Sequence, residues 1–304
     1  DLAAVLDGVF LEMAPVALVP GPDAATAAGW LVELWEQLGT PVADRSGALG
    51  VDPIGVAARH GGDPDLSTLA PAVASVADAP GVHAITVDAT VWADSGASEA
   101  WELACSLATG VAYLRALEDD GVSIDDALGA LTFTYSADAD QFRTVARFRA
   151  ARRLWDRVAG SCGSDVRAQH QTAVTSDAML ARRDPWVNLM RGAVAAFSAG
   201  IGGASSVTVR PFDSAIGRPD EFGRRTARNT QLLLTEESGL ARVVDPAGGS
   251  WFVEEFTERL AGAAWERFRW IEADGGMLAA LSSGRIADEV GATRTARAAR
   301  LATR

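Results

Sequence analysis

The stretch His83–Glu118, HAITVDATVWADSGASEAWELACSLATGVAYLRALE, places a short β-branched run before a long helical pattern. The first six residues predict a strand over His83–Asp88. From about Ser98 to Glu118 apolar residues recur at helical spacing, which predicts an amphipathic helix. The segment is therefore predicted to form one βα unit.

The same alternation extends over most of the chain. Further strands are predicted over Pro15–Pro20, Ala48–Asp52, Leu131–Tyr135, Val166–Gln171 and Ser206–Asp213. Further helices are predicted over Asp23–Leu38, Pro53–His60, Leu66–Ala79, Asp140–Val158, Pro185–Ala199, Pro219–Ser238 and Val253–Ala273. Because no hairpin signal separates the strands, we expect parallel strands joined by right-handed crossovers.

Two α/β architectures fit this alternation, a doubly wound sheet and a TIM-type (β/α)8 barrel. The doubly wound dinucleotide fold has G-x-G-x-x-G after its first strand, and no such motif follows Pro20. Gly200, Gly202 and Gly203 follow a predicted helix, where a C-cap explains them. The sequence therefore favours a barrel. Because a complete barrel has eight units, we expect the first two to lie before Asp1.

The predicted domain organisation follows from this barrel. Residues 1–285 are expected to form the partial barrel with extra C-terminal helices, and residues 286–304 a frayed helix or linker. An incomplete barrel leaves the edge of its first strand open, so poor solubility or dimerisation is expected.

Composition excludes several classes of protein. All 27 basic residues are arginine, so Schiff-base chemistry, a pyridoxal-phosphate anchor and a phosphate-loop lysine are excluded. A net charge of −13 opposes nucleic-acid binding. No apolar run reaches the ~20 residues that cross a membrane, and no secretion signal opens the chain. The two cysteines indicate neither a disulfide framework nor a thiolate metal site, so a cytoplasmic protein is expected.

Polar residues that follow the predicted strands are the candidate site residues, because the active site of a parallel barrel lies at the carboxyl ends of its strands. They are Asp52, Asp88, Thr90, Ser136, Asp138, Gln171 through Ser176 (including Thr175 and Ser176), and Asp213. Facing carboxylates could act as acid and base if their environments separate their pKa values. Alternatively, each aspartate caps the helix that follows its strand.

The histidines and arginines give weaker signals. His60, His83 and His170 form no metal-binding spacing, so no metal site is expected. His170, near the carboxyl end of its predicted strand, is the best titratable candidate, although a core histidine is the alternative. Five arginines share one predicted helix face: Arg147, Arg149, Arg152, Arg153 and Arg157. They could bind anions, but a solvated face paired with acids, or a protein interface, is favoured.

The run Arg224–Trp251, RRTARNTQLLLTEESGLARVVDPAGGSW, resembles the signature of the methylmalonyl-CoA mutase family of adenosylcobalamin-dependent isomerases. Matching signature positions are Arg228, Asn229, Gln231, Glu236, Glu237, Asp245, Pro246, Gly249 and Ser250, whereas Thr226 replaces the usual isoleucine. The resemblance extends over nearly the whole chain. RRDPWVN from Arg182 and PFDSAIG from Pro211 resemble the small subunit of the heterodimeric bacterial enzymes.

The resemblance implies a substrate-binding barrel followed by a cobalamin-binding domain, with radical chemistry supplied by the cofactor. The cobalamin motif D-x-H-x-x-G is absent, so adenosylcobalamin is expected in the assembled enzyme but not on this chain. The Tyr-His pair of the active subunit aligns with Thr90 and Val91, and valine cannot donate a hydrogen bond. The family's Gln-Thr-Ser-Gly-Trp run aligns with Val174–Ala178, which keeps only the hydroxyls of Thr175 and Ser176.

The leading hypothesis is a mainly structural, small-subunit-like component of methylmalonyl-CoA mutase. Its expected partner is a large catalytic subunit, and the assembly would isomerise methylmalonyl-CoA and succinyl-CoA in propanoate metabolism. The alternative is an active mutase for methylmalonyl-CoA or another branched acyl-CoA, with Asp88, Thr90 or His170 replacing the usual groups. A hydrolase barrel using Asp52, Asp88 and Asp213 would leave the Arg224–Trp251 match unexplained.

Overall fold

The computed structural model describes residues 2–19 and 21–302. They fall into two compact units. The first contains the residues up to Asp88 together with Ala108–Phe133 and Val158–Arg167. The second contains Ala89–Leu107, Thr134–Arg157 and the chain from Ala168 onward.

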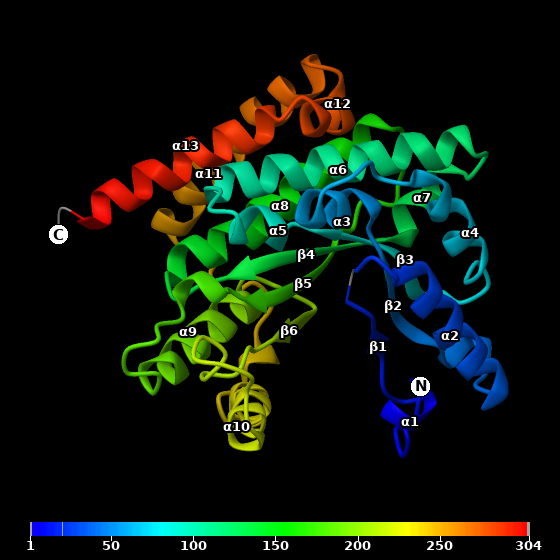
Figure 1. The fold of residues 1–304 in the computed structure, drawn as a ribbon, viewed down its shortest axis with the longest axis horizontal. Helices are drawn as coiled ribbons and strands as arrows, with labels where there is room; N and C mark the ends of the chain where they lie inside the picture. Colours follow the sequence, from blue (N-terminus) through cyan, green and yellow to red (C-terminus); the bar gives the residue numbers. More distant parts are fainter. Residues whose placement is uncertain (1, 20, 303–304) are drawn as a thin grey trace. The chain divides into compact units, whose positions relative to one another are not determined.

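A six-stranded sheet has each strand beside its neighbours in sequence (Figure 1). Its strands are β1 (Val16–Ala17), β2 (Ser46–Val51), β3 (Gly81–Asp88), β4 (Leu131–Ala137), β5 (His170–Thr175) and β6 (Ser206–Thr208). The β1–β2, β2–β3 and β5–β6 pairs are parallel. A doubly wound sheet reverses its strand order at a switch point, and this sheet does not. The α/β class is therefore confirmed for the described residues, and each predicted strand has a counterpart in this sheet. Pro20, the predicted end of the first strand, lies outside the described residues.

Helices join the strands as the sequence alternation predicts. In the first unit they are α1 (Leu2–Val5), α2 (Ala24–Gln37), α3 (Pro53–His60), α4 (Leu69–Ala74) and α7 (Ile124–Ala130). The helices α6 (Glu99–Asp119) and α8 (Gln141–Ser161) contribute to both units. The second unit also has α5 (Thr90–Asp94), α9 (Val187–Ile201), α10 (Glu221–Leu232), α11 (Trp251–Ala273), α12 (Gly276–Ser282) and α13 (Arg285–Ala302). No helix among the described residues combines the length and apolarity needed to span a membrane.

Each unit has its own apolar core. In the first unit, Leu31 and Trp35 of α2 and Ile54 of α3 are fully buried. In the second, Tyr135 of β4 and Phe148 of α8 are fully buried and meet edge to face, with 5.8 Å between ring centroids. These apolar positions are those that the helical and strand periodicities predict.

One predicted strand is displaced in the structure. The strand predicted over Val166–Gln171 lies four residues later, because Gln171 is a buried core residue rather than a terminal one. Its side-chain amide donates to the Phe148 carbonyl at 3.0 Å and to Gln169 Oε1 at 2.8 Å, so a polar residue occupies an apolar position. The end of the chain, for which a frayed helix or linker was predicted, is the 18-residue helix α13 up to Ala302.

Gly47 permits the pairing of β1 with β2. Its φ is +131°, and a Cβ there would overlap the carbonyl oxygen of Val16 on β1. We therefore expect Gly47→Ala to lower the free energy of unfolding by about 2–4 kcal/mol, measured by urea denaturation. Gly29→Ala is the matched control, because a Cβ at this position of α2 meets nothing within 4 Å. The control should stabilise the protein by up to about 1 kcal/mol. Equal effects of the two substitutions would contradict this role of Gly47.

Candidate functional site

Asp52 lies at the centre of a buried polar cluster in the first unit, where β2 ends and α3 begins. Its Oδ1 accepts the Gly55 N–H at 3.0 Å and the Tyr113 hydroxyl, and its Oδ2 accepts the Asp88 N–H at 3.0 Å. The Tyr113 oxygen in turn accepts the Ile54 N–H at 2.8 Å. Asp52 therefore joins β2, α3, β3 and α6, and one of its roles is to cap α3.

Burial is also the main influence on how Asp52 ionises. It raises the pKa of Asp52 to about 6, while the bond from Tyr113 opposes this change and the charge of Asp88 adds to it. Asp88 forms an ion pair with Arg59, with 3.0 Å between Oδ2 and Nη2. The structure thus brings together two of the predicted carboxylates, but intramolecular donors hold both of them.

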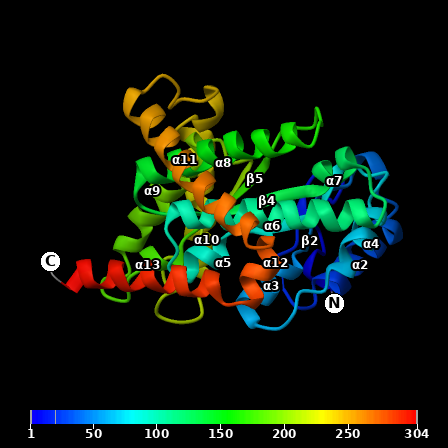
Figure 2. The same ribbon diagram turned by 90° about the horizontal axis from the view of Figure 1, so that it is seen from above.

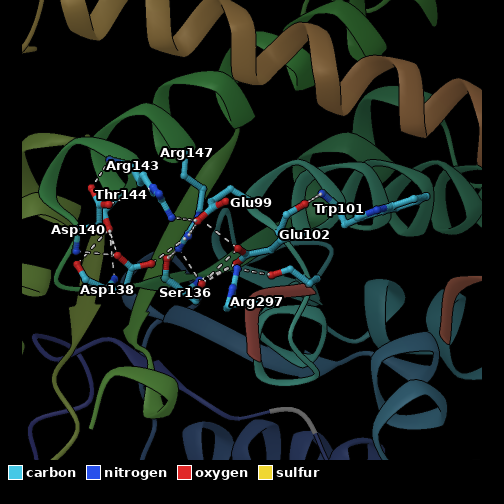
Figure 3. Close-up of polar contacts among 12 residues, drawn as sticks. Glu99, Trp101, Glu102, Ser136, Asp138, Asp140, Arg143, Thr144, Arg147 and Arg297 are labelled. Carbon is cyan, nitrogen blue, oxygen red and sulfur yellow. Dashed lines mark hydrogen bonds and ion pairs between the residues drawn. The ribbon is translucent and has the colours of Figure 1, made fainter. Parts of the chain in front are cut away.

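A second cluster, the Glu102–Arg147 network, lies at the carboxyl end of β4 in the second unit (Figure 3). Glu102 of α6 and Arg147 of α8 are both buried, with 3.2 Å between Oε2 and Nε. Glu102 Oε1 accepts the Ser136 N–H at 2.9 Å and its hydroxyl at 3.0 Å. Arg147 donates to the Ser136 carbonyl and hydroxyl and to Asp138. The network therefore ties the end of β4 to two helices.

The network borders a polar cavity of about 270 Å³, to which Arg143 and Arg297 also contribute. Burial raises the pKa of Glu102 to about 7, although the charge of Arg147 works in the opposite direction. A carboxyl group with such a pKa can exchange a proton near neutral pH. Both of its oxygens, however, accept hydrogen bonds from Ser136, and Oε2 also forms the ion pair with Arg147. A change in the protonation of Glu102 would therefore alter contacts that stabilise the fold.

The other predicted site residues also make structural contacts. Thr90 and Val91 are buried in α5. Thr175 Oγ1 accepts the Arg210 N–H at 2.8 Å, and Ser176 Oγ accepts the Ala178 N–H at 3.2 Å. Asp213 Oδ2 accepts the Asp220 N–H at 2.9 Å, which closes the loop before α10. The hydrogen bonds of Thr175, Ser176 and Asp213 fix the loops that follow β5 and β6.

The predicted place of His170 is wrong. His170 opens β5, so it lies at the amino end of the strand rather than at the carboxyl end. The strand was predicted over Val166–Gln171, whereas β5 spans His170–Thr175. His170 is therefore not part of a site formed by the carboxyl ends of the strands.

The arginine face of α8 is paired with acids, as predicted, but two of its members are not solvated. Arg147 is buried in the network above. Arg149 binds Asp245 in the signature turn and Glu254 of α11. One turn further along α8, Arg153 pairs with Glu258. After another turn, the guanidinium carbon of Arg157 lies 4.0 Å from the centroid of the Trp265 ring. Arg152 donates to Gln171 and to the Gly202 carbonyl. This face therefore joins α8 to α11, which cross in Figure 2.

The signature positions divide into bonded and exposed groups. Gln231 of α10 donates to the Val207 carbonyl of β6, and the Gly249 N–H donates to Glu254. Asp245 adopts a φ of +47° in the turn that continues through Pro246 to Ser250. Four side chains are exposed: Arg228, Asn229, Glu236 and Glu237. The signature thus includes both the bonds that shape this turn and a charged surface.

Sequence reasoning missed Glu102 and Tyr113 as cluster members. Both lie inside the helix predicted from about Ser98 to Glu118, on faces that are otherwise apolar. A single acid between Trp101 and Leu103 is the signal that could have identified Glu102, because a buried acid requires a partner.

The histidines and acids of the described residues are dispersed or held by partners within the chain. Across residues 2–19 and 21–302, no group of three or more His, Cys, Asp and Glu side chains is arranged to hold a metal ion. His83 Nδ1 contacts the Gly129 carbonyl oxygen at 3.0 Å, and burial lowers the pKa of its ring. His60 ends α3, and His170 opens β5. None of the histidines belongs to either polar cluster.

Comparison with known proteins identifies the family. The family model described as methylmalonyl-CoA mutase matches residues 1–304. The chain belongs to the methylmalonyl-CoA mutase family. The resemblance seen in Arg224–Trp251 is thereby confirmed.

Relatives within the family give a finer comparison. The methylmalonyl-CoA mutase small subunit of Streptomyces virginiae is 52% identical over 309 aligned positions, covering 100% of this chain and 50% of that protein. That of Propionibacterium freudenreichii subsp. shermanii is 42% identical over 307 positions, covering 100% and 48%. The methylmalonyl-CoA mutase of Cereibacter sphaeroides is 40% identical over 210 positions, covering 67% and 29%. The chain thus spans about half the length of the small subunits it matches.

The raised pKa of Asp52 predicts a pH-dependent stability. Between its ordinary value of 3.8 and about 6, the folded state binds a proton that the unfolded state has released. The free energy of unfolding should therefore fall by up to about 3 kcal/mol as pH rises through this window. Asp52→Asn should make the total fall smaller by that amount, measured by urea unfolding from pH 4 to 7, and should leave the part that comes from the raised pKa of Glu102. The exposed control Asp78→Asn should keep the wild-type profile. A fall in Asp52→Asn as large as that of the wild type would contradict the assignment.

The Glu102–Arg147 pair predicts strong coupling between its members. Arg147→Met leaves a buried carboxylate without its cation, so we expect a loss of about 3–5 kcal/mol at pH 8. Adding Glu102→Gln removes that charge but keeps an acceptor for Ser136, so the double variant should recover about 2 kcal/mol. A double-mutant cycle of unfolding free energies measures this coupling. Additive losses would show that the two side chains are energetically independent.

Proposed function

We propose that this chain is the barrel part of a methylmalonyl-CoA mutase small subunit and that its role is mainly structural. Similarity to small subunits along the full chain is the observation that carries this proposal. The assembled enzyme, with a large catalytic subunit, would interconvert methylmalonyl-CoA and succinyl-CoA as an isomerase. Adenosylcobalamin would supply the radical chemistry in that assembly.

The contacts of the polar residues support a structural role. A catalytic group needs a free donor, acceptor or titratable atom directed at the reacting group. At the positions aligned with the family's Tyr-His pair, Thr90 and Val91 are buried, and valine has no hydrogen-bonding group. The oxygens of Asp52 and Glu102 hold backbone and side-chain donors of this chain. These residues would keep the barrel rigid beneath the partner subunit.

The rest of the architecture is part of the same proposal. Six strands in sequential order are consistent with the larger part of a (β/α)8 barrel, completed by two further βα units beside β1. Residues 286–304 would lead toward a domain of the cobalamin-binding type. We place the assembly in the cytoplasm, with acyl-CoA bound by the large subunit.

Assembly is the direct test of this function. The chain should form a stable complex when co-expressed with a methylmalonyl-CoA mutase large subunit, seen as co-elution on gel filtration. Isomerase turnover should require the large subunit. Two folded proteins that elute separately would contradict the proposal. Turnover by this chain with adenosylcobalamin alone would favour the alternative of a catalytically active mutase.

A further inference from the structure

The last helix, α13, is attached to the second unit in two different ways along its length. In its first half, Ile286 and Val290 are buried. In its second half, none of residues 291–300 is buried. Helices in proteins owe most of their stability to the packing of an apolar face. The second half, residues 291–302, which we name the strap, therefore depends on a few individual contacts for its position.

The first of these contacts is a close approach of the strap to the turn between α5 and α6. A Cβ at Gly96 would lie 2.9 Å from Arg294 Cβ and 3.0 Å from its Cγ. Because these atoms lie next to the backbone of α13, a side chain at Gly96 would displace the helix itself. The turn is ordered, since the Gly96 N–H donates to the Ala93 carbonyl at 2.9 Å and the Ala97 N–H to the Trp92 carbonyl at 3.0 Å.

The second contact is made by Arg297, about one turn further along α13. Its Nη2 donates to the Ala97 carbonyl at 3.4 Å, and its side chain lines the polar cavity beside the Glu102–Arg147 network (Figure 3). Apart from Arg297, the charged residues that line this cavity are four acids and two arginines: Glu99, Glu102, Asp138, Asp140, Arg143 and Arg147. With all of them ionised, this lining is negative, so it attracts the guanidinium of Arg297.

The two contacts fall on adjacent residues of the same turn. Arg294 packs against Gly96, and Arg297 bonds to Ala97. The turn leads directly into the first turn of α6, where Glu102 holds the end of β4 through Ser136. A movement of the strap therefore changes the surroundings of both the turn and the network through direct contacts.

We propose that the strap is an electrostatic latch, which alternates between a state docked on the α5–α6 turn and a released state in which that turn loosens. Docking of the strap and order of the turn stabilise each other, because each provides the contacts of the other. Both partners belong to this chain, so the inference does not depend on the proposed function. Salt should release the latch, since it screens the attraction between Arg297 and the acids.

Hydrogen exchange of the whole chain, followed by mass spectrometry, tests the coupling from both sides. Gly96→Ala displaces Arg294, so exchange over residues 291–302 should become about tenfold faster or more. Gly121→Ala is the matched control, because Gly121 has a φ of +83° and a Cβ there would meet nothing within 4 Å. It strains the backbone in the same way without touching α13, so exchange of the strap should stay as in the wild type.

Arg297→Glu is the reciprocal variant, because it places a carboxylate before the acids. Exchange should accelerate in the strap and, by about threefold or more, in residues 93–99, whose sequence is unchanged. Ala298→Glu adds a carboxylate at the next, exposed position and should leave residues 93–99 as in the wild type. Raising NaCl from 50 to 300 mM should speed strap exchange in the wild type and slow it in Arg297→Glu, since salt screens attraction and repulsion alike.

Three results would overturn the latch. The first is wild-type exchange of the strap in both Gly96→Ala and Arg297→Glu. The second is acceleration in Arg297→Glu that is confined to the strap, because it would separate the strap from the turn. The third is complete exchange of the wild-type strap at the earliest time point, because the strap would then not be docked. Circular dichroism checks folding, and Arg297→Glu with its control decides the matter if Gly96→Ala does not fold.

Discussion

The buried ion pair between Glu102 and Arg147 is the constraint on which the second unit depends. Removing two charges from water costs several kcal/mol each, and this cost is offset only when geometry and additional hydrogen bonds are good. Ser136 supplies those bonds, because its N–H and hydroxyl donate to Glu102 while its carbonyl and hydroxyl accept from Arg147. The pair therefore fixes the end of β4 between α6 and α8. Once α8 is fixed, Arg149, Arg153 and Arg157 face α11 and the signature turn.

The polar residues at the strand ends of this chain are of the kinds found in active sites, and they make contacts within the chain. Parallel strands bring polar residues to one edge, where an enzyme directs some of them at a ligand. Here Asp52, Thr175 and Asp213 accept hydrogen bonds from backbone N–H groups of the chain itself, and Ser136 bonds to the side chains of Glu102 and Arg147. Asp52 accepts three internal hydrogen bonds, so it has little remaining capacity to bind a substrate. A support role for a catalytic partner is consistent with that arrangement.

The sequence predicted the elements much better than the side-chain clusters. The helix over Pro53–His60 was predicted to the residue, because Asp52 and Pro53 form a strong helix start. The place of His170 was wrong, because a buried glutamine with internal partners is not visible in a hydrophobic pattern. The Glu102–Arg147 network was missed for a related reason. Each partner lies on a helix whose periodicity is informative, but their pairing depends on tertiary contacts between α6, α8 and β4.

The central claim is that this chain supports catalysis without contributing a catalytic group. Isomerase kcat, measured on complexes of this chain with the large subunit and checked by gel filtration, tests it directly. Thr90→Val in this chain removes the hydroxyl aligned with the family's catalytic pair, and replacing the tyrosine of that pair in the large subunit with phenylalanine is the comparison. The account predicts that kcat falls only with the large-subunit substitution and stays within twofold of wild type with Thr90→Val. A large loss of kcat in an intact Thr90→Val complex would contradict it.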